Sequence, residues 1–126
     1  MAESDLFHKW VDGSLTREDI QVEVNRLAEN ISIGLPHEQR KLNTMLSESD
    51  LQHIGMCLEH IYLWWRDDKS VGSFLAPFIR NNLTRTFQNA DSINWLGLGI
   101  YVEYLHWNAP GSWRTKQRKD YEREGA

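Results

Sequence analysis

The chain has a single cysteine, Cys57, among its 126 residues, so no disulfide can form within it. That composition suits a reducing compartment. The longest mostly apolar stretch, from Trp95 to Leu105, includes Glu103 and is too short to cross a bilayer, which takes about 20 apolar residues. The start of the chain, MAESDLFHKW, has no basic segment and no long apolar run, so it does not indicate a secretory signal. We expect a cytoplasmic protein without a membrane partner.

Positive charge is scarce over most of the chain. The net charge is −4, with nine Lys and Arg against fifteen Asp and Glu in residues 1–113, and a weakly basic segment over 114–126. Binding to nucleic-acid phosphates needs a basic surface, so a nucleic-acid partner is not expected for the acidic body. The charged segment 114–126 is expected to be a disordered tail.

Sequence patterns that indicate a catalytic site or β-strands are also nearly absent. The sequence has no glycine-rich phosphate loop and no nucleophile motif, and it contains no internal repeat. We therefore expect a protein that is not an enzyme and needs no cofactor. Apolar residues recur with helical spacing instead, which predicts an all-α fold.

The predicted fold is a compact bundle of about five helices in a single domain over residues 1–113. Residues 1–46 form its N-terminal helical part and 47–113 its core helices. The expected helices cover 4–11, 16–30, 49–66, 74–89 and 91–107, with a weaker helical segment over 37–46.

Residues that favour helix starts precede three of these segments. Thr16 is the expected N-cap of the second helix, and Asp91 that of the last. Ser49 with Gln52 matches the capping-box pattern for the helix over 49–66.

The helix over 91–107 is apolar on almost every side. A helix of this kind is buried on most sides, so we expect it to be central in the domain or to take part in self-association. Gly97 and Gly99 cost helix stability but permit a close backbone approach.

Tryptophan is abundant, with six residues. Consecutive residues point about 100° apart on a helix, so Trp64 and Trp65 cannot both pack fully against one neighbour. Exposed Trp beside Arg66 has the composition of a binding hot spot, to which Trp107 and Trp113 could contribute. A binding surface and simple core packing both remain open for this group.

Polar side chains interrupt the apolar patterns and must be hydrogen-bonded. The favoured interpretation is structural, with Asp91 as an N-cap and the asparagine amides bonded to neighbouring helices. The alternative is a ligand-binding pair of Asp91 and Asn94 with Arg80 or Arg85. The structural polar group is Asn81, Asn82, Asp91 and Asn94.

His53, Cys57 and His60 follow one helical face, and both residue types bind zinc. Three ligands on one straight helix rarely converge on one ion, so they are a weak candidate for a metal site, and His106 could join them only through a tertiary contact. The favoured alternative is a mixed stripe with Cys57 buried as a small hydrophobic residue.

A pattern of small, polar and aromatic residues runs through the second half of the chain: Gly72, Phe74-Leu75, Asn81-Asn82-Leu83, Ala90-Asp91, Asn94, Tyr104, Pro110 and Trp113. With this pattern, residues from about 50 to 113 resemble a group of small uncharacterised helical proteins encoded by phages and prophages. The chain departs from that group's pattern at Pro77, Asn82 and Asn89, where Ala, Asp and Arg are more usual. The resemblance implies a phage-associated protein in the host cytosol and implies no particular activity.

The functional hypothesis is a phage or prophage accessory protein that binds another protein without catalysis, by inhibiting or redirecting a host factor. It is also expected to form a homo-oligomer. The alternatives are a nucleic-acid or nucleotide-binding module that uses Arg80, Arg85 and the basic tail, and a metal-binding enzyme that uses His53, Cys57 and His60.

Overall fold

The computed structural model describes residues 5–67, 69, 71, 75, 78, 84, 86 and 91–109. This part of the chain is mostly helical, as the periodicity predicts. Among these residues, no helix has both the length and the apolar character needed to cross a bilayer. The elements are α1 (Asp5–Asp12), α2 (Arg17–Asn30), β1 (Ser32–Ile33), β2 (Arg40–Lys41), the 3-10 helix η1 (Leu42–Thr44), α3 (Glu48–Asp67) and α6 (Ser92–Asn108).

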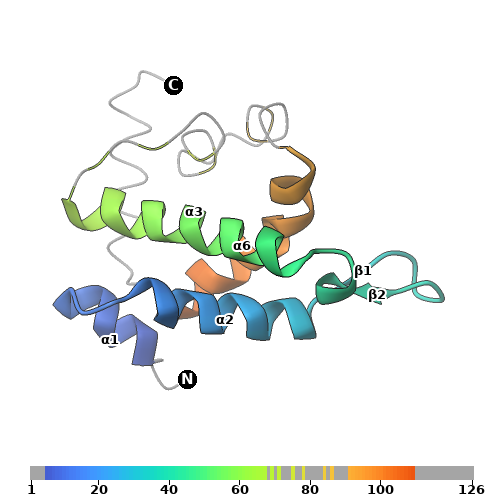
Figure 1. Ribbon diagram of the computed structural model, residues 1–126, viewed down its shortest axis with the longest axis horizontal. Coiled ribbons are helices and arrows are strands. Elements are labelled where there is room, and N and C mark those ends of the chain that lie inside the picture. Colours follow the sequence, from blue (N-terminus) through green and yellow to red (C-terminus); the bar gives the residue numbers. More distant parts are fainter. Residues whose placement is uncertain are drawn as a thin grey trace.

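Three long helices pack against one another. In Figure 1, α2 and α3 run side by side, and α6 lies behind them and contacts both. The short α1 precedes α2 and also contacts α6. The strands form a small hairpin that projects beyond the far end of α2. Residues from the N-terminal part of the chain therefore pack directly on the later helices.

Reciprocal capping fixes where α2 begins. The Thr16 hydroxyl accepts a hydrogen bond from the Asp19 amide at 3.1 Å, and the Asp19 carboxylate accepts one from the Thr16 amide at 3.0 Å. The predicted N-cap at Thr16 is therefore confirmed. These two bonds satisfy backbone donors that a helix start leaves unpaired.

The start of α3 differs from the prediction. The reciprocal bonds join Ser47 and Asp50, at 2.9 and 3.1 Å, and not Ser49 and Gln52. An Asp carboxylate is a charged acceptor at the positive end of the helix dipole, which favours this earlier pair. The helix consequently begins at Glu48.

The predicted helical segment over 37–46 is wrong for residues 37–41. Residues 32–41 form an antiparallel hairpin, in which Ser32 pairs with Lys41 and Ile33 with Arg40. Residues 37–41 are polar and exposed, so they lack the apolar anchors that hold a helix on a core. The short 3-10 helix η1 follows and begins at the fully buried Leu42, whose amide also donates to the Ile31 carbonyl at 3.0 Å.

The predicted helix over 74–89 lies mostly outside the described residues. Leu75, Phe78, Thr84 and Thr86 are helical, as predicted. Leu75 is buried in the core, and the Phe78 ring lies 5.7 Å from that of Tyr101.

An aromatic cluster around Trp10 closes one end of the core. Trp10 is fully buried, and its ring lies 5.0 Å from Tyr62, 5.8 Å from Trp65 and 6.4 Å from Tyr104. Its indole N–H donates to the Tyr104 hydroxyl at 3.2 Å. Because burying a polar group without a partner costs free energy, this bond lets both side chains remain inside the core.

Gly97 allows α6 to approach α3 closely. A Cβ at position 97 would lie 2.7 Å from the Ile54 Cδ1, a side chain that is itself fully buried. A Cβ at Gly99, two residues on, would meet only ordinary contacts among the described residues, the nearest being the Ile31 Cγ2 at 3.7 Å. Within this part of the chain, packing therefore favours glycine at 97 and does not call for it at 99.

We predict that Gly97→Ala lowers the free energy of unfolding by about 1–2 kcal/mol, because overpacking outweighs the better helix propensity of alanine. The matched Gly99→Ala should leave it unchanged or raise it by up to about 1 kcal/mol. Urea unfolding of both variants in dilute solution measures the difference. Equal shifts for the two variants would contradict this account of the α3–α6 contact.

Candidate binding groove

A mostly apolar groove lies between the hairpin and the N-terminal half of α6. Its volume is about 460 Å³. The hairpin is held in place by the buried Leu42, and α6 starts at its N-cap Asp91, whose carboxylate accepts from the Asn94 amide at 2.8 Å. The lining residues are Ile33, Gly34, Glu38, Arg40, Met45, Trp95, Leu96 and Gly99.

Trp95 is the most informative residue of the groove, because half of this large aromatic side chain is in solvent (50% exposed). Met45 on the opposite side is also exposed. An apolar groove edged by an exposed Trp and Met has the composition of a protein-binding site.

The apolar surface continues along α6 beyond the groove. Trp95, Gly99 and Val102 recur at spacings of four and three residues, so they share one face of the helix. Val102 is 56% exposed. The opposite face, with Ile100 and Tyr104, is buried. We call Trp95, Gly99 and Val102, together with the groove, the groove face.

Two opposite charges border the groove. Glu38 and Arg40 both line it and both are exposed. The Glu38 carboxylate lies 3.6 Å from the His37 ring nitrogen. Arg40 makes no ion pair within the described residues, so its guanidinium is available to a partner.

The predicted tryptophan surface does not assemble as expected. Trp64 is 4% exposed, so its tentative assignment to a binding surface is corrected. It lies on the side of α3 that faces the core. Trp65 is half-buried against Trp10, and Arg66 is exposed. Trp107 is exposed and donates from its indole N–H to Glu103 at 2.9 Å. Trp113 lies outside the described residues.

The candidate metal ligands make one close contact. The Cys57 sulfur lies 3.7 Å from the His53 Nε2, whereas His60 is exposed. Nowhere in the described ranges do three or more His, Cys, Asp or Glu side chains form a group able to hold a metal ion. Burial raises the pKa of the Cys57 thiol, and a hydrogen bond with Tyr101 offsets this only partly.

Asn94 is buried, and its amide oxygen accepts a hydrogen bond from the Tyr101 hydroxyl at 2.6 Å. This bond lies within α6, and the expected bond from Asn94 to a neighbouring helix stays a prediction. Burial also raises the pKa of Tyr101. Together with Cys57, these groups form a neutral polar cluster inside the core. The two arginines of the alternative ligand site, Arg80 and Arg85, and the paired asparagines, Asn81 and Asn82, lie outside the described residues.

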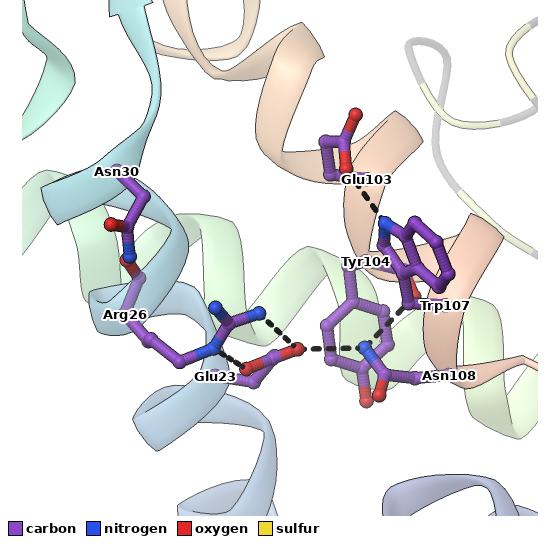
Figure 2. Close-up of polar contacts among 7 residues, drawn as sticks. All are labelled: Glu23, Arg26, Asn30, Glu103, Tyr104, Trp107 and Asn108. Atoms are coloured by element: carbon purple, nitrogen blue, oxygen red, sulfur yellow. Dashed lines mark hydrogen bonds and ion pairs between the residues drawn. The ribbon is translucent and has the colours of Figure 1, made fainter. Parts of the chain in front are cut away.

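A second polar group, not foreseen from the sequence, joins the end of α6 to α2 (Figure 2). Glu23 accepts bonds from Arg26 at 2.6 and 3.0 Å and from the Asn108 amide at 3.0 Å. The Asn108 amide also donates to the Tyr104 carbonyl at 3.1 Å. Burial acts to raise the pKa of Glu23, but the bonds from Arg26 and Asn108 outweigh it and hold the pKa below its ordinary value of 4.5.

Comparison with known proteins gives no relative: no protein-family model matches the chain, and no curated protein or solved structure matches it. The functional argument therefore rests on the geometry of the chain itself.

Two signals in the sequence could have pointed to the groove. Trp95 lies off the core stripe of α6 that includes Ile100 and Tyr104, although it is one of the two tryptophans of that helix. Ile33 and Met45 are large apolar residues in segments that the helical pattern does not place in the core. Their proximity to Trp95 depends on the hairpin, which the sequence pattern does not predict.

We predict that Glu23→Gln lowers the free energy of unfolding at pH 7 by about 1–2 kcal/mol, around the lower end of the range for hydrogen bonds to charged groups, because Arg26 is largely exposed. Since the folded pKa of Glu23 is depressed, its stabilisation is present above its ordinary pKa and is lost as the pH falls through the folded value. Stability of Glu23→Gln should thus fall less between pH 5 and pH 3. Urea unfolding across this range tests the point, with the exposed Glu29→Gln on the same helix as control.

We also predict that Cys57 reacts slowly with a thiol reagent in the native protein, because a buried thiol with a raised pKa holds little thiolate. The rate should be at least about tenfold below that of a Cys57→Ser/Val22→Cys reference variant, whose thiol lies at an exposed site on α2. Equal native rates would show that the Cys57 thiol is accessible to solvent and would contradict its burial in the core.

Proposed function

We propose that the protein acts by non-catalytic binding of another protein through the groove face. The observation that carries the proposal is Trp95, an aromatic side chain half exposed at the edge of an apolar groove. Aromatic side chains in this setting become buried on binding and contribute much of the binding free energy. Exposed Val102 extends the apolar surface along the same face of α6.

The chemistry of the core supports binding over catalysis. The single thiol is buried, and its raised pKa disfavours the nucleophilic thiolate. The hydroxyls of Tyr101 and Tyr104 are buried, and burial raises their pKa values as well. Such groups satisfy one another's hydrogen bonds and stabilise the fold.

The wider proposal is a cytoplasmic accessory protein of a phage or prophage, folded as a single domain with about five helices, that inhibits or redirects a host protein. The phage origin is supported by the resemblance over residues 50–113, and the host target is an association with that class of protein, not a deduction from any residue. The acidic body of the chain supports a protein partner over a nucleic acid.

We predict that the photo-crosslinking amino acid p-benzoylphenylalanine at position 95 forms a covalent adduct with a protein when the chain is expressed in bacteria. The same group at position 22, an exposed apolar site on α2 outside the groove, is the control. Adducts are detected by gel shift and identified by mass spectrometry. Absence of any adduct above the position-22 control would contradict a protein-binding role for the groove face.

A further inference from the structure

We propose that the occupant of the groove face is a second copy of this chain, in a two-fold symmetric dimer whose α6 helices cross antiparallel near Gly99. The inference rests on the proposed function, because it names the protein that this face binds.

Gly99 is the first observation. Glycine weakens a helix interior, so its presence is informative where packing within the chain does not require it. Gly97 is favoured by the close contact with Ile54, whereas among the described residues a Cβ at position 99 would meet Ile31 only at 3.7 Å or beyond. Gly99 is half-buried and shares one face of α6 with the exposed Trp95 and Val102. A bare backbone at this place allows another helix to approach closely.

The spacing of the apolar residues suits a symmetric contact. Trp95 lies four residues before Gly99 and Val102 three residues after it. When two antiparallel copies cross at Gly99, Trp95 is set opposite Val102 of the partner subunit, and the reciprocal pair forms by symmetry. A two-fold interface requires this self-complementarity, since the same patch serves both subunits. Dimer formation would remove two exposed apolar side chains of each copy from water, Trp95 (50% exposed) and Val102 (56% exposed).

Charge complementarity is the second argument for a copy of the same chain. Each chain has a net charge of −4, so two copies repel unless opposite charges meet locally. The groove supplies both signs, Glu38 and Arg40, and both are exposed. The proposed axis near Gly99 is the one that also passes between Glu38 and Arg40, which pairs Glu38 with Arg40 of the partner subunit at two equivalent contacts. A partner with a uniformly acidic surface would repel Glu38, and one with a uniformly basic surface would repel Arg40.

The test reverses the charge of one residue of the Glu38–Arg40 pair at a time. Wild type, Glu38→Arg and Arg40→Glu are compared by sedimentation velocity from about 1 to about 300 µM at low salt, a range that brackets micromolar dissociation constants. Wild type should form a dimer. Each single variant should raise the dimer dissociation constant by about tenfold or more, because like charges then face each other.

Mixing Glu38→Arg with Arg40→Glu restores opposite charges at both contacts. The mixture should form a heterodimer that native mass spectrometry separates from either homodimer by mass. Gly99→Ala should weaken the wild-type dimer while leaving the thermal unfolding midpoint of the monomer unreduced, which shows that folding is not the cause.

Several results would overturn the inference. They are a wild-type monomer at every concentration, a dimer insensitive to both charge reversals, and a mixture without heterodimer. A monomer whose position-95 crosslinker captures a different protein would overturn the dimer and leave the proposed function standing. A monomer without any adduct would overturn both.

Discussion

The close contact between α6 and α3 at Gly97 is the constraint on which the other described contacts of α6 depend. Contact with Ile54 at this point sets the distance between the two helices and turns the Gly97 side of α6 toward α3. Farther along α6, the Tyr104 hydroxyl meets the Trp10 indole, and Asn108 meets Glu23 on α2. These two contacts, together with the close approach at Gly97, define the direction of α6.

The exposed face of α6 follows from the same contact. The helix carries apolar residues on nearly every side, and once Ile100, Tyr104 and their neighbours are buried, Trp95 and Val102 must face away. The hairpin then adds Ile33 and the exposed Met45 beside Trp95 and turns an apolar stripe into a groove. An apolar surface of this extent lowers the solubility of a free chain, which is why we interpret it as a surface that another protein covers.

The helices could be predicted from the sequence because their signals are local. Apolar spacing and the caps at Thr16 and Asp91 depend on neighbours in the chain, and they place α2 and α6 within a residue or two. The hairpin and the contact from Asn108 to Glu23 depend on residues brought together by the fold. The orientation of Trp64 is of the same kind: periodicity shows that the two adjacent tryptophans diverge, but only the packing of α3 decides which of them enters the core.

The most direct test of the central claim is a ¹⁹F NMR dilution series on protein labelled with 5-fluorotryptophan, with the resonance of Trp95 assigned by Trp95→Phe. If the groove face is covered by a second copy, the Trp95 resonance should shift with protein concentration while that of the buried Trp64 stays fixed. A Trp95 resonance that keeps the same position from the most dilute to the most concentrated sample would contradict the account.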